Sequence, residues 1–257
     1  MIVTPQHVEA AYKRILKWVR ITPIIRMQGP GARPVIFKLE GCQRSGSFKL
    51  RGALNKLIAL GDRSRNGVIA ASGGNHGLGL AWAGWLTGVP VKVFVPTTTP
   101  TFKRLRLEQT NADVVYVSGD YAMAEAEAIA EAERARKPYI HAYNDKEVIA
   151  GQATLVREFY RQAPEMRTVV VAVGGGGLLA GASVGAAFNH HQQQLRWSVV
   201  MGWSEGQGHT ATTAGWLQHG ERRRTVQLLG LPEVLLRVAV LVEHAAAVRI
   251  HGAVAYI

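Results

Sequence analysis

One lysine stands where a loop rich in serine and glycine gives way to an expected helix. Lys49 follows Gly46, Ser47 and Phe48 and falls in the first turn of a helix expected over 47–59. A lysine at such a place is usually an exposed surface residue. The positive end of a helix and partial burial, however, both disfavour the protonated amine and lower its pKa. A neutral amine is the form required for Schiff-base chemistry and for proton abstraction.

Four consecutive glycines follow an apolar run at 168–173 and open a segment rich in small residues. Without Cβ atoms, their backbone N–H groups can close around an anion such as phosphate, and the dipole of a following helix favours the same charge. A plain tight turn is the alternative, but four glycines exceed what a turn requires and add an entropic cost. The spacing matches neither the complete Gly-x-Gly-x-x-Gly motif nor a P-loop. We therefore expect a phosphate-binding loop made of Gly174, Gly175, Gly176 and Gly177.

A third loop follows the strand expected at 67–71 and precedes a helix expected at 78–86. It consists of Ser72, Gly73, Gly74, Asn75, His76 and Gly77. Ser72 or Asn75 can simply cap the helix. Alternatively, the exposed backbone amides bind a carboxylate while Asn75 contacts an oxygen of a cofactor. The loop alone leaves both interpretations open.

The elements that must position these loops alternate along the chain. Short β-branched runs predict strands at 35–39, 67–71, 91–95, 113–117 and 168–173. Segments rich in Ala and Leu predict helices at 47–59, 78–86, 101–109, 121–136 and 151–161. This alternation predicts an α/β fold with open parallel sheets and flanking helices. In such sheets ligands bind beyond the carboxyl ends of the strands, where the three loops lie.

Composition narrows the classes of partner. The net charge of +12 attracts anions, including nucleic acid and phosphorylated cofactors. The basic run at 222–224 has no interleaved aromatic residues and indicates a solvated face rather than a nucleic-acid groove. We expect neither a secretory signal at 1–20 nor a membrane span, because no apolar run reaches ~18 residues. A single cysteine, Cys42, excludes an internal disulfide and a zinc-type Cys/His spacing, and fits a reducing cytoplasm.

Taken together, the three loops resemble the serine/threonine dehydratase family, which belongs to the fold-type II pyridoxal-phosphate (PLP) enzymes. The similarity covers about 5–195 and includes Ile21-Thr22-Pro23, Asn144-Asp145 and the run at 148–152. It implies a PLP cofactor and two lobes, a large PLP-binding lobe at 1–64 and 148–257 and a small lobe at 65–147. It also implies a homodimer acting on a small amino-acid substrate.

The resemblance implies a role for each loop residue. Lys49 matches the Schiff-base lysine, which also removes the Cα proton of the substrate. Phe48 matches the residue that packs near the cofactor ring, and Asn75 the asparagine that hydrogen-bonds the PLP phenolic oxygen. The phosphate loop matches Gly174, Gly175, Gly176 and Gly177. The loop that holds the substrate carboxylate matches Ser72, Gly73, Gly74, Asn75 and His76.

The implied reaction is the dehydration and deamination of a β-hydroxy amino acid such as L-serine or L-threonine, which yields a 2-oxo acid and ammonia. Serine racemases are similar but carry a second serine where this chain has Gly73. Because racemisation requires an acid or base on both faces of the cofactor, a dehydratase is preferred to a racemase. A β-replacement enzyme is a further alternative. A basic anion- or nucleic-acid-binding protein is the alternative from another class.

The C-terminal region departs from the family pattern after about Val199. From Ser198 onward the chain has no Asp and no Lys. We assign no metal ligands, and Thr210, Thr212 and Thr213 are the candidates for contacting the pyridine nitrogen. Two explanations stay open. The region is a rebuilt part of a short natural variant, or it is the product of a frameshift or deletion that leaves an inactive relic.

Overall fold

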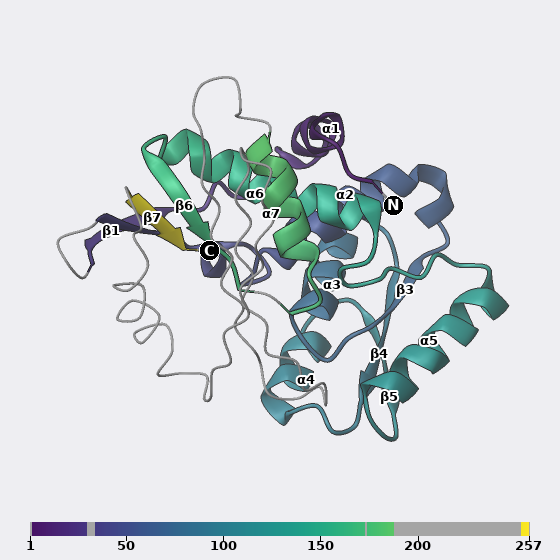
Figure 1. The fold of residues 1–257 in the computed structure, drawn as a ribbon. Coiled ribbons are helices and arrows are strands. Elements are labelled where there is room, and N and C mark those ends of the chain that lie inside the picture. Colours follow the sequence, from purple (N-terminus) through teal and green to yellow (C-terminus); the bar gives the residue numbers. More distant parts are fainter. Residues whose placement is uncertain (1, 30–33, 173, 188–252, 257) are drawn as a thin grey trace, which may run out of the picture.

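The computed structural model describes residues 2–29, 34–172, 174–187 and 253–256 (Figure 1). The strands are β1 (Ile24–Gln28), β2 (Pro34–Lys38), β3 (Val68–Ala71), β4 (Val91–Pro96), β5 (Asp113–Val117), β6 (Met166–Val170) and β7 (Ala253–Tyr256). The helices are α1 (Pro5–Ile15), α2 (Lys49–Leu60), α3 (Asn75–Thr87), α4 (Thr101–Glu108), α5 (Tyr121–Ala135), α6 (Lys146–Gln162) and α7 (Gly177–Ala187). Short 3-10 helices lie at Glu40–Cys42 and Gly61–Ser64. Val173, the three threonine candidates and the basic run at 222–224 lie outside the described residues.

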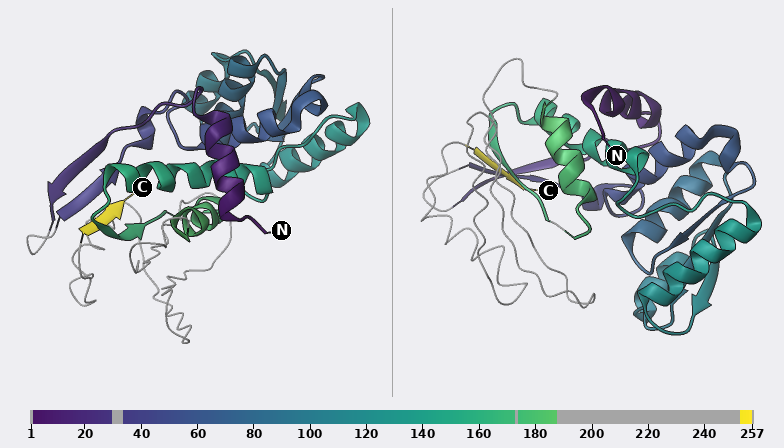
Figure 2. Two further views of the ribbon diagram at one scale, coloured as in Figure 1. Left: turned by 90° about the horizontal axis from the view of Figure 1, so that it is seen from above. Right: turned by 45° about the vertical axis from the view of Figure 1, so that its right-hand side comes forward.

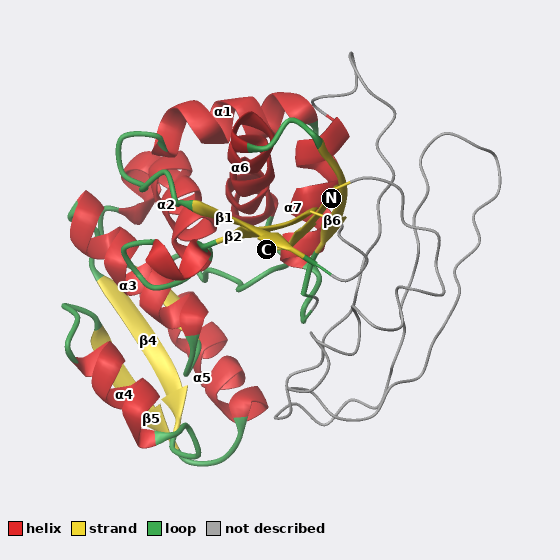
Figure 3. Ribbon diagram, turned by 90° about the vertical axis from the view of Figure 1, so that its left-hand side faces the viewer, coloured by secondary structure: helices red, strands yellow, loops and turns green. Residues whose placement is uncertain are grey.

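A parallel sheet in the order β3-β4-β5 is covered on both faces. Val68 and Ala70 belong to the core cluster that contains α3 residues, whereas Ile69 and Ala71 pack with the alanines of α5. Alternate residues of one strand therefore meet helices on opposite sides, which explains why this strand is an unbroken apolar run. In Figure 3 these strands form a group separate from the other sheet.

The second sheet has the order β1-β2-β7-β6. Its strands run parallel except for β1, which pairs antiparallel with β2. Ile36, Val169 and Phe159 form a core with residues of α6 and α7. Helix α1 lies against α6 (Figure 2), where Arg157 Nη2 and Glu9 Oε2 are 3.0 Å apart. The expected α/β architecture with mainly parallel sheets and flanking helices is confirmed.

Most element boundaries lie within two residues of the sequence expectation, and the helix expected at 78–86 begins three residues earlier, at Asn75. Two other boundaries also differ. The strand expected at 168–173 lies at Met166–Val170, and the helix expected from residue 151 begins at Lys146. The earlier start follows from Asp145, whose carboxylate accepts the N–H groups of Glu147 and Val148 and so caps the helix. None of the helices in the described parts of the chain is long and apolar enough to cross a membrane.

The helix that begins at Lys49 is held against α6 by a very close approach. A Cβ placed on Gly151 would lie 2.5 Å from the carbonyl oxygen of Arg51 and 2.6 Å from the Cα of Gly52. A Cβ on Gly52 would in turn lie 2.7 Å from the carbonyl oxygen of Val148. Because any side chain at either glycine would push the helices apart, the two glycines set the position of α2.

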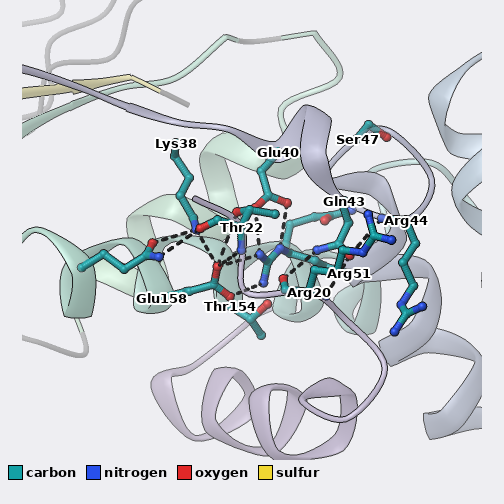
Figure 4. A network of polar contacts seen from close by, with 12 residues as sticks. Arg20, Thr22, Lys38, Glu40, Gln43, Arg44, Ser47, Arg51, Thr154 and Glu158 are labelled. Carbon is teal, nitrogen blue, oxygen red and sulfur yellow. Dashed lines mark hydrogen bonds and ion pairs between the residues drawn. The ribbon is translucent and has the colours of Figure 1, made fainter. Parts of the chain in front are cut away.

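A buried group of four charges fixes the same helix (Figure 4). Arg51 donates to both oxygens of Glu40 and to both oxygens of Glu158, at 2.8 to 3.1 Å. Lys38 Nζ lies 2.5 Å from Glu158 Oε1. These side chains are at most 6% exposed. Two cations and two carboxylates balance, so this ion cluster (Lys38, Glu40, Arg51, Glu158) joins β2, the Glu40–Cys42 turn, α2 and α6 without a net buried charge.

Candidate active site

Lys49 is the first residue of α2, and its side chain points into the protein. Its Nζ donates a hydrogen bond to the carbonyl oxygen of Ala142 at 2.9 Å. Burial lowers the pKa of the Lys49 amine from 10.5 to about 8. About a tenth of the side chains are therefore neutral at pH 7, against fewer than about one in a thousand for an ordinary lysine. The sequence expectation of a lowered amine pKa agrees with this geometry.

Phe48 lies directly before Lys49 and anchors this end of the helix. Its half-buried ring packs against the core cluster that includes Val171 and Leu178, the residues on either side of the glycine loop. The Lys49 Nζ lies 5.5 Å from the centre of the ring. Phe48 therefore links the lysine to the segment that carries the expected phosphate loop.

The loop at 72–76 leads from β3 into α3. Helix α3 begins at Asn75, and Gly74 occupies its N-cap position without a side-chain cap from the described residues. The Ser72 hydroxyl accepts the N–H of Gly74 at 3.2 Å, and Asn75 is exposed. Neither Ser72 nor Asn75 is a helix cap, which removes the simpler of the two interpretations.

His76 lies in the same loop, but its side chain is directed inward. The buried ring places Nε2 3.0 Å from the carbonyl oxygen of Ile140. Burial, and secondly the nearby charge of Lys49, lowers the pKa of His76 to about 4. The ring is therefore neutral near pH 7 and donates from Nε2, because a carbonyl oxygen only accepts. This side chain fixes the loop against the 140–143 segment. The backbone of His76, rather than its ring, is therefore the part that could contact a ligand.

The glycine loop rests on a tyrosine. A Cβ on Gly175 would lie 2.3 Å from the Tyr143 ring, and a Cβ on Gly177 would lie 2.8 Å from the Tyr143 Cβ. Gly176 has a φ of +82°, which a residue with a side chain rarely adopts. Gly177 begins α7. The expected glycines at a helix N-terminus are present. Close contact with Tyr143 requires glycine at 175 and 177, and the positive φ favours glycine at 176.

Gly73 is also closely approached by a side chain. A Cβ on Gly73 would lie 2.3 Å from the Thr99 Oγ1 and 2.8 Å from its Cγ2. Thr99 follows β4, so two neighbouring strands of the three-stranded sheet each contribute to this contact. The space that a serine side chain would need at this position is filled by the threonine.

All three predicted loops meet one short segment, residues 140–143. Ile140 accepts from His76, Ala142 accepts from Lys49, and Tyr143 supports the glycine loop. Sequence reasoning identified the loops but missed this segment. A signal was present, since His141, Ala142 and Tyr143 stand directly before the Asn144-Asp145 motif that entered the family resemblance.

Comparisons with known proteins agree with this site. A family described as pyridoxal-phosphate dependent enzyme matches residues 15–242. An L-threonine ammonia-lyase of Geobacter sulfurreducens is 35% identical over 187 residues, which cover 71% of this chain and 46% of the relative. A serine racemase of Bos taurus is 36% identical over 184 residues, which cover 69% and 55%. A crystal structure of a pyridoxal 5'-phosphate-dependent aspartate racemase matches with a TM-score of 0.70 and 33% identity, covering 77% of this chain and 62% of that one.

The chain spans about half the length of the curated relatives it matches. The relatives named as ammonia-lyases and those named as racemases have similar identities, so they support the family and its cofactor without separating the two reactions. The matching structure supports the fold-type II architecture implied by the sequence motifs. The chain therefore belongs to the family of pyridoxal-phosphate dependent enzymes.

Proposed function

We propose that this protein is a PLP-dependent lyase that dehydrates and deaminates a β-hydroxy amino acid such as L-serine or L-threonine, releasing a 2-oxo acid and ammonia. The observation that carries the proposal is that a buried lysine amine with a lowered pKa and the glycine cradle contact adjacent residues of one segment. Lys49 contacts Ala142, and the glycine loop rests on Tyr143.

The described residues fit PLP, which carries an aldehyde and a phosphate. The buried, partly deprotonated amine of Lys49 suits the aldehyde. The cradle of Gly174, Gly175, Gly176 and Gly177 presents backbone N–H groups at the start of α7, which suits the phosphate. Two residues before Lys49, the buried Ser47 Oγ has no hydrogen-bond partner among the described residues.

When bound, PLP withdraws electrons from the Cα of an attached amino acid. The chain supplies the remaining functions. In its neutral form the Lys49 Nζ accepts the Cα proton, and burial increases the share of this form by lowering the pKa to about 8. Phe48 would pack beside the cofactor ring, and Asn75 would contact its phenolic oxygen. The backbone of Ser72, Gly73, Gly74, Asn75 and His76 holds the substrate carboxylate at the N-terminus of α3.

The preference for elimination over racemisation rests on Gly73. Racemisation requires a second acid or base on the opposite face of the cofactor. At this position glycine provides no such group, and Thr99 leaves no room for a serine. Racemase names among the relatives keep racemisation as the second candidate.

A spectrum with PLP followed by product analysis tests the proposal. The full chain should show a visible absorbance band with PLP that borohydride removes. Lys49→Ala should lose the band, whereas the exposed-lysine control Lys103→Ala should keep it. With serine, threonine, hydroxyaspartate and phenylserine, release of a 2-oxo acid is expected from at least one. A colourless protein that takes up no PLP contradicts the cofactor assignment, and a D-amino acid product without 2-oxo acid favours the racemase.

The Gly73 argument has its own test. Gly73→Ser alone should weaken PLP binding because of the clash with Thr99 Oγ1. Combining it with Thr99→Ala removes that atom and should allow racemisation, detected by chiral chromatography of the amino acid. Racemisation by the unaltered protein at a rate comparable to elimination would refute the role given to Gly73.

We extend the proposal to the oligomeric state, the cellular compartment and the partners of the enzyme. A homodimer in the cytoplasm, without nucleic acid as partner, fits the resemblance and the exposed thiol of Cys42. Light scattering of the purified chain and a binding assay with random DNA at physiological salt test the two partner statements. A salt-sensitive complex with DNA would favour the basic-binder alternative.

A further inference from the structure

The segment Tyr139–Asn144 (residues 139–144) joins the three loops of the site, so what fixes its shape bears on all of them. At its start the backbone is tied to β3, because Ile140 N donates to Ile69 O at 2.8 Å. Beyond Ile140 the chain leaves the sheet edge and turns. The turn presents the Ala142 carbonyl to Lys49 and the Tyr143 ring to Gly175.

The His141 side chain closes this turn. Its Nδ1 accepts the backbone N–H of Tyr143 at 3.2 Å and that of Asn144 at 2.9 Å. Two donors at Nδ1 require that this nitrogen carries no proton, so the ring N–H is at Nε2. The ring also meets the Tyr143 ring edge to face, with centres 4.5 Å apart. His141 therefore holds both the backbone and the side chain of Tyr143.

On its other side His141 faces a carboxylate of α5. Its Nε2 lies 3.9 Å from Glu125 Oε1. The same oxygen accepts the hydroxyl of Tyr139 at 3.0 Å and that of Tyr121 at 3.3 Å. Burial and the Glu125 charge raise the pKa of both phenols, so both remain donors. The carboxylate is thereby held in place beside the imidazole.

We propose that His141 is a positioning residue for the PLP site, acting through Tyr143 on the glycine loop and through the Ala142 carbonyl on Lys49. Among the described residues, no hydrogen bond or ion pair joins His141 to either loop. The contacts run from Glu125 to His141, from His141 to Tyr143, and from Tyr143 to Gly175. The inference rests on the proposed PLP site and adds to it a support outside the three sequence motifs.

Two substitutions at residue 141 separate the acceptor from the ring. His141→Asn keeps a short side chain whose carbonyl can accept from backbone N–H groups two and three residues onward, as asparagine does in turns. His141→Phe keeps an aromatic ring against Tyr143 and loses the acceptor. The measured quantity is the dissociation constant of PLP from the full chain, by titration of the apoprotein. Circular dichroism and melting temperature of the apoproteins establish that both variants fold.

The expected result is a PLP dissociation constant about 10- to 30-fold higher for His141→Phe, which corresponds to about 1.4 to 2 kcal/mol. His141→Asn should stay within about threefold of the unaltered protein, because it restores the accepted hydrogen bonds. Affinity of His141→Phe equal to that of the unaltered protein overturns the inference. Equal weakening of both variants also overturns it, because the accepted hydrogen bonds would then not be the cause.

A second variant covers the case in which His141→Phe does not fold. Tyr143→Leu leaves the His141 acceptor bonds in place but removes the ring under Gly175. It should weaken PLP binding by about tenfold or more. Unaltered affinity in Tyr143→Leu contradicts the inference. Failure of the unaltered protein to take up PLP is a different result, since it contradicts the proposed function itself.

Discussion

Replacing Lys49 by methionine should stabilise the apoprotein at neutral pH. Burial lowers the pKa of the amine from 10.5 to about 8. At about 1.36 kcal/mol per pKa unit, the protonated amine costs the folded state about 3 kcal/mol relative to a neutral side chain. Methionine has a similar length and no charge. We therefore expect Lys49→Met to raise the free energy of unfolding by about 2 to 3 kcal/mol at pH 7.

The increase in the free energy of unfolding caused by Lys49→Met should become smaller as the pH rises. Between about pH 8 and 10.5 the unfolded lysine holds its proton while the folded one has lost it. Stability of the unaltered protein therefore rises with pH in this window, and the advantage of Lys49→Met falls to about 0.5 kcal/mol near pH 10.5. The sign follows because the unfolded state binds more protons there.

Urea unfolding of both apoproteins at pH 7, 9 and 10, followed by circular dichroism, measures this difference. Other titrating groups cancel in the comparison, since they are common to both proteins. Lys103→Met is the matched control, because Lys103 is exposed and its replacement should change little at any pH. A stability gap that is the same at all three pH values, or a less stable Lys49→Met at pH 7, would refute the reasoning.

Two further predictions concern the contacts that hold the site. Gly175→Ala should weaken PLP binding at least tenfold, because its Cβ would lie 2.3 Å from the Tyr143 ring. Gly174→Ala is the control, since a Cβ there would meet no atom within 4 Å, and it should weaken PLP binding less. Equal losses of PLP affinity in the two variants would contradict the contact argument. Glu158→Gln should reduce the free energy of unfolding by about 3 to 5 kcal/mol, because it leaves an uncompensated buried cation. Glu165→Gln, which removes a surface pair partner 47% exposed, should cost less than about 1 kcal/mol in the same urea titration.

The positions of helices and strands were predictable from the sequence where a segment carries a clear apolar pattern. The strands expected at 91–95 and 113–117 lie almost where the apolar runs place them, at Val91–Pro96 and Asp113–Val117. Both are set by local hydrophobicity. Strand β1 was not predicted because its residues are mostly exposed and show no apolar run, and it is defined by pairing with β2. Long-range pairing of that kind leaves little trace in the sequence of one strand.

The site was predictable as a set of motifs but not as a set of contacts. The motifs indicated Lys49 and the glycine loop, yet they gave no role to Tyr143, whose ring lies against Gly175. His76 shows the opposite case. Its motif suggested a ligand contact, whereas its side chain is committed to the Ile140 carbonyl. A motif shared by a family records both ligand-binding residues and residues that pack, and only the structure separates them.

Burial of Lys49 needs a cause, because a long lysine side chain ordinarily extends to water. The cause lies in how firmly the start of α2 is clamped. Arg51, two residues onward, is fixed by two carboxylates, and α3 approaches so closely that a Cβ on Gly79 would lie 3.1 Å from the Lys49 Cβ. From this fixed helix start the Lys49 amine reaches the Ala142 carbonyl in the interior, and burial there lowers its pKa. The ion cluster and the packed glycines therefore contribute to the chemistry, since they hold the start of α2 where burial lowers the pKa of the amine.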